Sequence, residues 1–213
     1  TAKTVAQRIV AAHNKDYEKR AVLRDLVRAE EAELKNAIIF CNRKKDVADL
    51  FRSLDRHGFS VGALHGDMDQ RSRTTMLQNF KDGNLKLLVA SDVAARGLDI
   101  PDVSHVFNFD IPIHSEDYVH RIGRTGRAGR SGKAFTIVTK SDTKYLDAIE
   151  KLIGEKIEWL NGDLSTLPAP MESFESNSGR RGKERGGRGR ERNRRDAAPV
   201  ENINQGVQSE IGR

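Results

Sequence analysis

The chain has 213 residues and a formal net charge of +6 at pH 7. This length supports one hydrophobic core of ordinary domain size plus a further segment, and it excludes two large domains. A single cysteine, Cys41, excludes an internal disulfide and favours a reducing compartment. No apolar run approaches the length of a membrane-spanning helix, so we expect a cytoplasmic protein without a membrane partner. The first residue is Thr1 rather than Met, which favours a fragment of a longer protein.

The positive charge is concentrated near the C-terminus. Residues 180–196 contain nine Arg or Lys and three acidic residues, which accounts for the net charge of the whole chain. Residues 176–196 are rich in Gly, Arg, Ser and Asn, and no aromatic residue follows Phe174, so this segment has too little apolar surface to offset the entropy of ordering. We predict an ordered domain at residues 1–154, a short extension at 155–170 and a disordered, Arg/Gly-rich basic tail at 171–213.

Hydrophobic spacing predicts an alternation of strands and helices along the ordered domain. Residues 4–11 fit a strand or a helix equally. Strands are predicted at 37–41, 60–65, 85–91, 105–110 and 133–139, and residues 156–160 fit either a further short strand or a hydrophobic clip in which Trp159 covers apolar surface. Helices are predicted at 17–33, from about Val47 to a stop at Gly58, at 70–81, at 93–96, from Ser115 through Arg127, and from a cap at Ser141 to Gly154. Repeated alternation of this kind predicts a doubly wound α/β domain, in which helices cover both faces of a parallel sheet.

Polar clusters follow the predicted strands at their carboxyl ends. Any one cluster alone is better explained as ordinary loop chemistry than as a functional site. Ligands of open parallel sheets bind beyond the carboxyl ends of the strands, so the clusters together predict one functional edge. The clusters are Asn42-Arg43-Lys44, His65-Gly66-Asp67, Ser91-Asp92 and Asp110-Ile111-Pro112.

The densest cationic pattern is residues 120–127, which read His-Arg-Ile-Gly-Arg-Thr-Gly-Arg. Tyr118 and Ile122 supply an apolar stripe for the preceding helix, and the spacing predicts that Arg124 and Arg127 project together from another face. Two guanidinium groups on a short rigid element suit a phosphate that gains charge in a transition state. The alternative is a solvated basic end of a helix.

Residues 120–127 resemble the last conserved motif of the DEAD-box RNA helicases. The resemblance implies a RecA-like domain over residues 1–154, in which residues 4–11 form a strand. It implies that Arg127 is a catalytic arginine finger, that Arg124 is a second catalytic contact to the γ-phosphate of ATP, and that His120 and Arg121 contact another domain.

Residues 90–100 resemble the DEAD-box segment that touches RNA at its start and nucleotide at its end. The resemblance implies that Ser91 and Asp92 bind RNA and that Gly97 and Asp99 bind ATP. The alternatives are a helix N-cap for Asp92, which is equally favoured, and a cap or turn residue for Asp99.

Two further segments resemble RNA-contacting elements of the same family. Gln70 and Arg73 match its Gln-x-x-Arg element, shortly after Gly66, although helical spacing alone makes them an exposed polar face. Residues 38–44 resemble the preceding family motif, with Arg43 at a position where many members carry Thr. The resemblance implies RNA contacts by Arg43, Gly66, Gln70 and Arg73.

The chain lacks a Gly-x-x-x-x-Gly-Lys-Ser/Thr phosphate loop, an Asp-Glu-Ala-Asp stretch and any zinc-type spacing of Cys and His. We therefore predict no metal held by this chain. ATP and Mg²⁺ are expected to be held mainly by an N-terminal RecA-like domain of the same protein, and the fragment alone is expected to be inactive.

The function predicted from the resemblance is that of the C-terminal domain of an ATP-dependent DEAD-box RNA helicase, which unwinds duplexes locally. The expected partners are RNA, the N-terminal domain and, through the tail, other ribonucleoprotein components. Two alternatives stay open: a stand-alone RNA-binding or annealing module without ATPase activity, and a DNA-processing helicase of the wider superfamily.

Overall fold

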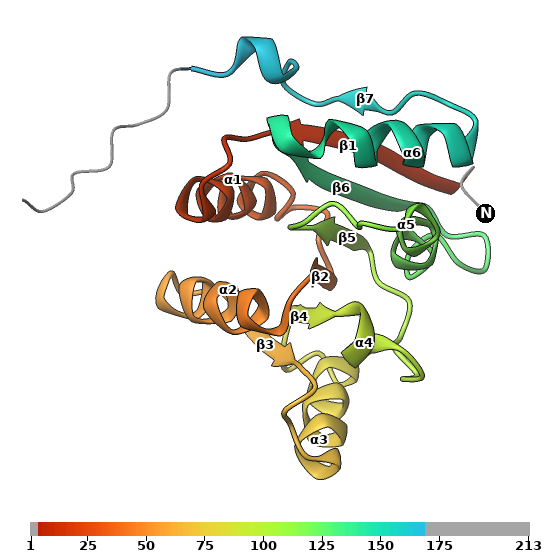
Figure 1. The fold of residues 1–213 in the computed structure, drawn as a ribbon. Helices are drawn as coiled ribbons and strands as arrows, with labels where there is room; N and C mark the ends of the chain where they lie inside the picture. The colour runs from red at the N-terminus through yellow and green to blue at the C-terminus, as the bar shows by residue number, and fades with distance from the viewer. Residues whose placement is uncertain (1–3, 169–213) are drawn as a thin grey trace, which may run out of the picture. The chain divides into compact units, whose positions relative to one another are not determined.

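The computed structural model describes residues 4–168, which form a seven-stranded sheet flanked by helices (Figure 1). The predicted tail at 171–213 lies outside the described residues. The strands are β1 Val5–Ala11, β2 Ala37–Cys41, β3 Val61–Leu64, β4 Leu87–Ser91, β5 His105–Asn108, β6 Gly132–Val138 and β7 Glu158–Trp159. The α-helices are α1 Asp16–Ala29, α2 Lys44–Arg56, α3 Gln70–Lys81, α4 Asp92–Ala95, α5 Ser115–Ile122 and α6 Thr143–Ile153, and η2 Lys140–Asp142 and η3 Leu164–Thr166 are 3₁₀-helices.

The strand order in the sheet is β3-β4-β2-β5-β6-β1-β7, and every strand pair is parallel. All the carboxyl ends therefore meet at one edge of the sheet, which is called the carboxyl edge below. The predicted doubly wound, RecA-like α/β fold is confirmed. The segment at 4–11 is a strand, as the family resemblance implied.

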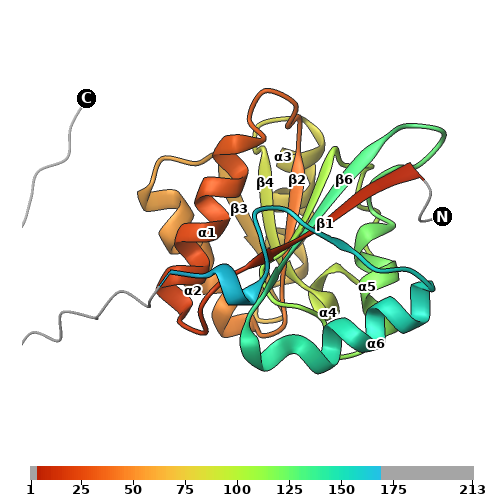
Figure 2. The same ribbon diagram turned by 90° about the horizontal axis from the view of Figure 1, so that it is seen from above.

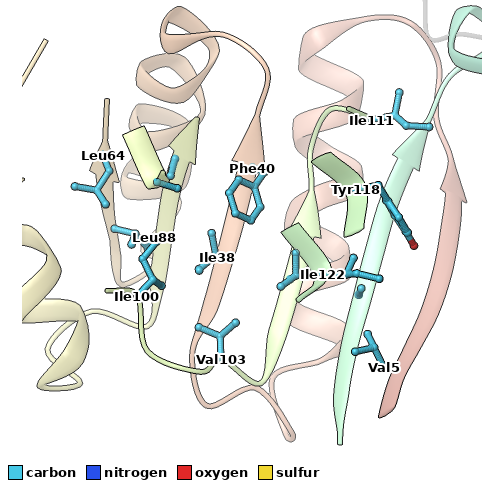
Figure 3. Packing of buried hydrophobic residues seen from close by; sticks show 14 of the residues in the cluster. Val5, Ile38, Phe40, Leu64, Leu88, Ile100, Val103, Ile111, Tyr118 and Ile122 are labelled. Carbon is cyan, nitrogen blue, oxygen red and sulfur yellow. The ribbon is translucent and has the colours of Figure 1, made fainter. Parts of the chain in front are cut away.

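Two hydrophobic cores cover the two faces of the sheet. In β2, Ile38 and Phe40 face the core formed with α3, α4, α5 and α6, while Ile39 and Cys41 face the core formed with α1 and α2. Figure 1 shows α1 and α2 on one side of the sheet and α4 and α5 on the other. Figure 3 shows the first core at close range, with side chains of α5 packed over the central strands. This double burial explains why β2 is apolar throughout and β4 is apolar up to its last residue, Ser91.

The start of the last helix differs from its prediction. Thr139 and Asp142, not Ser141, form the capping box that starts η2 ahead of α6. Within α6, Leu146 and Ile149 face the core, whereas Leu152 is 47% exposed.

The short extension packs beside β1. β7 pairs with β1, the Leu160 amide donates to the Ile9 carbonyl at 2.8 Å, and a ring nitrogen of His13 lies 2.6 Å from the Pro168 carbonyl oxygen. Figure 2 shows this segment running across β1 toward α1. The predicted strand near 156–160 is thus confirmed. Among residues 4–168, no helix is both long and apolar enough to cross a membrane.

Candidate functional site

The buried guanidinium of Arg121 organises the carboxyl edge of the sheet. Arg121 is on α5 and only 1% exposed. It donates to both carboxylate oxygens of Asp92, at 2.8 and 2.6 Å, to the side-chain oxygen of Asn42 at 2.8 Å and to the carbonyl of Asp110 at 2.7 Å. The guanidinium carbon also lies 5.2 Å from the centre of the Phe40 ring. Arg121 therefore joins the ends of three neighbouring strands, β4, β2 and β5.

The same network extends to α1 through the carboxylate of Asp110. That carboxylate accepts hydrogen bonds from Lys19 Nζ at 2.6 Å and from the Asn42 amide at 3.0 Å. Arg121 and Lys19 are thus each matched by an acidic group, which is the arrangement that a buried charge requires. The interdomain contact predicted for Arg121 stays a prediction; within this domain its side chain is enclosed and its donors are taken up by Asp92, Asn42 and Asp110.

Arg124 lies beside this network and has no acidic partner within residues 4–168. Its half-buried side chain lines a hollow together with Asp92, Arg96, His120 and Arg121. Burial and the neighbouring positive charge of Arg127 lower the pKa of Arg124. An unneutralised pair of guanidinium groups attracts an anion, and a phosphate satisfies both the charge and the donors.

Arg127 follows α5 rather than projecting from it. The helix ends at Ile122, with Gly123 as its C-cap, so the predicted helix through Arg127 is wrong. The Arg127 side chain is exposed, and its Nε donates to the Gly123 carbonyl at 2.7 Å. Gly126, with a φ of 69°, lies close to residues 4 and 5, where a Cβ atom would meet Val5 at 2.8 Å. The backbone turns away at this point, and a regular helix cannot continue.

His120, predicted to contact another domain, is exposed on α5. Its side chain is 77% accessible, and its Nδ1 is 4.0 Å from Asp117. Such a side chain is available to a partner outside this domain. It lies on the hollow that Arg124 also lines.

Residues 91–99 run from the hollow to an exposed turn. Ser91 is 7% exposed and caps α4 by accepting a hydrogen bond from the Ala94 amide at 3.3 Å, so the cap is Ser91 and not Asp92. The Asp92 carboxylate is instead engaged by Arg121. Gly97 has a φ of 76°, which favours glycine, with open space around the position of a Cβ atom. The Asp99 side chain is 98% accessible, 3.5 Å from Lys81.

The residues predicted to bind RNA from α2 and α3 lie outside the hollow. Arg43 is exposed and pairs with Asp46 through two hydrogen bonds of 2.8 and 3.3 Å, which raise the pKa of Arg43. Gly66 and Gln70 are exposed near the start of α3. Arg73 donates to the Ala94 carbonyl at 3.2 Å, which ties α3 to α4, and its buried Nε has no partner within the described residues.

The structure thus gathers four of the predicted site residues around one hollow, and α4 connects this hollow to α3. Asp92, His120, Arg121 and Arg124 surround one hollow, while Arg73 reaches α4 from α3. The sequence argument missed Asn108, whose side chain accepts from Arg121 at 3.3 Å, and the role of Thr125 described below. Asn108 is fully buried at the end of β5, and an Asn between the apolar residues Phe107 and Phe109 is a signal that could have identified it. Within residues 4–168, no group of three or more His, Cys, Asp or Glu side chains could hold a metal ion.

Comparison with known proteins agrees with this geometry. Residues 18–129 match the model of the helicase conserved C-terminal domain. The DEAD-box ATP-dependent RNA helicase CshA of Streptococcus pneumoniae is 47% identical over 163 residues, which is 76% of this chain and 30% of that protein. This chain therefore spans about a third of the length of such curated relatives.

Solved structures show the same relationship. The E. coli DEAD-box protein SrmB, bound to regulator of ribonuclease activity A, superposes with a TM-score of 0.71 and 38% identity, covering 80% of this chain and 99% of that chain. Dbp5 of S. cerevisiae, bound to RNA and ADP BeF3, gives a TM-score of 0.66 and 34% identity, covering 72% of this chain and 41% of that one.

The three-layer parallel sheet with an arginine-rich carboxyl edge defines a RecA-like α/β domain. The chain belongs to the helicase conserved C-terminal domain family, and it is the C-terminal domain of a DEAD-box RNA helicase.

Proposed function

We propose that this chain supplies the arginine finger and part of the RNA-binding surface of an ATP-dependent RNA helicase whose N-terminal RecA-like domain holds ATP and Mg²⁺. The observation that carries the proposal is the pair Arg124 and Arg127 in the segment after α5, whose side chains have no acidic partner in residues 4–168. An arginine finger must offer its charge to a nucleotide, so an internal ion pair would oppose the role. The chain is then one half of an active site.

On the nucleotide side, the proposed contacts are Arg124 and Arg127 to the γ-phosphate and Gly97 and Asp99 to the rest of the nucleotide. The half-buried position of Arg124 strengthens its interaction with an anion, because low local dielectric weakens screening. Asp99 projects into solvent and can accept hydrogen bonds from ribose hydroxyls. His120 is the proposed contact to the N-terminal domain, which its exposure supports.

On the RNA side, most of the proposed contacts are made by residues that follow the carboxyl ends of β2, β3 and β4. Gly66 and Gln70 offer exposed donors near the start of α3, and Arg43 is an exposed cation whose charge Asp46 partly offsets. Arg73, Ser91 and Asp92 have partners inside the domain, so their proposed contribution is to shape α4 as well as to touch the backbone of RNA. Contacts to 2′-hydroxyl groups would favour RNA over DNA.

Closure of the two domains links the two sides of the site. ATP and RNA shift the protein toward a closed state only as far as each binds that state more tightly. A closed surface that fits one bent strand and not a duplex separates strands locally. After loss of the γ-phosphate, Arg124 and Arg127 lose their contact, and the closed state is no longer favoured.

The proposal is tested with the full-length helicase that contains this chain. Strand displacement and ATP hydrolysis are measured on matched RNA and DNA duplexes, with and without ATP. We expect ATP-dependent displacement of the RNA strand and stimulation of hydrolysis by RNA. Equal activity on the DNA duplex would favour a DNA-processing helicase, and RNA annealing without any ATP hydrolysis would favour the stand-alone binding module.

The basic tail is a second proposed RNA contact, of the tethering kind. Nine Arg or Lys within residues 180–196 bind polyanions by releasing counterions, with little sequence preference and a steep dependence on salt. Truncation after Pro170 is expected to lower the RNA affinity of the chain about 10-fold or more at low salt and to reduce the slope of affinity against salt concentration. Filter-binding or fluorescence titrations at several salt concentrations measure both quantities. An unchanged slope contradicts RNA binding by the tail and leaves protein partners as its proposed targets.

A further inference from the structure

The segment that carries Arg124 and Arg127 is held by contacts to residues 102–103 rather than by helical hydrogen bonds alone. The Val103 amide donates to the Arg124 carbonyl at 3.0 Å, and residues 103 and 125 form an isolated parallel bridge. The Arg127 amide faces the carboxylate of Asp102 at 3.4 Å. These contacts are made at residues 124, 125 and 127, that is, at Thr125 and at the arginine on each side of it. They hold the segment after α5 at a defined position where the helix no longer does.

The Thr125 side chain is the most enclosed part of this junction. Thr125 is 2% exposed, and its hydroxyl donates a short hydrogen bond to the Val103 carbonyl. Its other side packs against Gly132, the first residue of β6, where a Cβ atom would come within 2.1 Å of the Thr125 hydroxyl oxygen. The side chain therefore fills a fixed space between residue 103 and the start of β6. The Val103 carbonyl is the acceptor of its hydroxyl in this enclosed space.

We propose that Thr125 is a positioning residue that sets the placement of Arg124 and Arg127, an inference that rests on the proposed arginine finger. Thr125 touches neither ATP nor RNA and acts through the arginines on its two sides. Residues 102–103 are separated from residues 97–99 by only two residues, so the same junction relates the arginines to the proposed ribose contact at Asp99. A misplacement of about 1 Å at a catalytic group costs on the order of 100-fold in rate, so a single hydrogen bond at this position affects catalysis strongly.

The experiment is a double-mutant cycle in the full-length helicase. Thr125→Val preserves the shape of the side chain and removes the hydroxyl, and it is expected to lower kcat for RNA-stimulated ATP hydrolysis about 10- to 100-fold, with KM for ATP changed by less than about 3-fold. Thr125→Ser retains the hydroxyl and is expected to recover most of the rate. In an Arg127→Ala background, the effect of Thr125→Val is expected to be clearly smaller than in the wild-type background, because one of the two groups that it positions is gone.

Thr139→Val is the matched control. Thr139 is a buried threonine whose hydroxyl bonds to Asp142 at 2.8 Å in the capping box before α6. The Thr139→Val variant is expected to lower the melting temperature as much as Thr125→Val does and to leave kcat within about 3-fold of wild type. This comparison separates a positioning role from a general effect on stability. Should Thr125→Val not fold, Asp102→Ala removes the acceptor of the Arg127 amide and is expected to lower kcat in the same direction.

Three results would overturn the inference. If Thr125→Val has a wild-type kcat while Arg127→Ala is strongly impaired, the positioning role of Thr125 is rejected and the arginine finger stands. An undiminished effect of Thr125→Val in the Arg127→Ala background shows that Thr125 does not act through Arg127. An unimpaired Arg127→Ala enzyme overturns the arginine finger, and the positioning role falls with it.

Discussion

Arg127→Ala is expected to lower RNA-stimulated ATP hydrolysis of the full-length helicase by about 10³- to 10⁵-fold, which is the range measured for arginine fingers. This corresponds to about 4 to 7 kcal/mol of activation free energy. The physical reason is that negative charge spreads over the transferred phosphoryl group in the transition state, where a guanidinium stabilises it. Arg127 is free for this role because its side chain is exposed and bonds only to a backbone carbonyl within the described residues.

The appropriate control for Arg127→Ala is Arg130→Ala. Arg130 is exposed in the same loop, three residues later, and faces a different cavity near the amino ends of the strands. Its removal changes the net charge equally and is expected to leave hydrolysis within about 2-fold of wild type. Initial rates at saturating RNA, with single-turnover measurements to separate chemistry from product release, decide the matter. Hydrolysis by Arg127→Ala within a few-fold of wild type would reject the finger.

Arg121→Ala is expected to lower the free energy of unfolding of the chain by about 3 to 5 kcal/mol, because it leaves the carboxylate of Asp92 without its partner in a largely enclosed place. The variant also removes the donors that hold Asn42 and the Asp110 carbonyl at the ends of β2 and β5. A loss of this size is a large part of the stability of an ordinary domain. Equilibrium unfolding in urea, monitored by circular dichroism, measures it.

Arg71→Ala and Arg121→Lys serve as controls for this prediction. Arg71 is exposed on α3, and its replacement is expected to change the free energy of unfolding by less than about 0.5 kcal/mol. Lysine at position 121 retains the charge but not the planar fork that binds both Asp92 oxygens, so an intermediate loss is expected. A loss below about 1 kcal/mol for Arg121→Ala would show that the network contributes little to stability.

The sequence identified most elements because each depends on local spacing. The bounds of β2 and α3 agree with their predictions residue for residue, since apolar runs and helical periodicity are properties of adjacent residues. Hydrophobic spacing left residues 4–11 undecided, and only the family resemblance favoured a strand. The end of α5 was missed because Gly123 permits either continuation or termination, and tertiary contacts at residues 102–103 decided the outcome.

The case of Arg121 shows a signal that was present but not used. Tyr118, Arg121 and Ile122 lie at spacings of three and four residues, which places all three on the buried face of α5. The family resemblance led instead to an interdomain contact. A charged residue on an apolar stripe predicts a buried network with acidic and amide partners, and Asn42, Asp92 and Asp110 were already recognised as strand-end residues.

The sequence by itself determined the class of the domain, the parallel sheet and the edge at which the polar residues gather, because alternating strands and helices constrain the chain to few topologies. Only the tertiary structure decided which arginine is enclosed and which are free. Burial of Arg121 depends on where β2, β4 and β5 end relative to α5. Those strands come from positions far apart in the chain, and no local pattern encodes the distances between their ends.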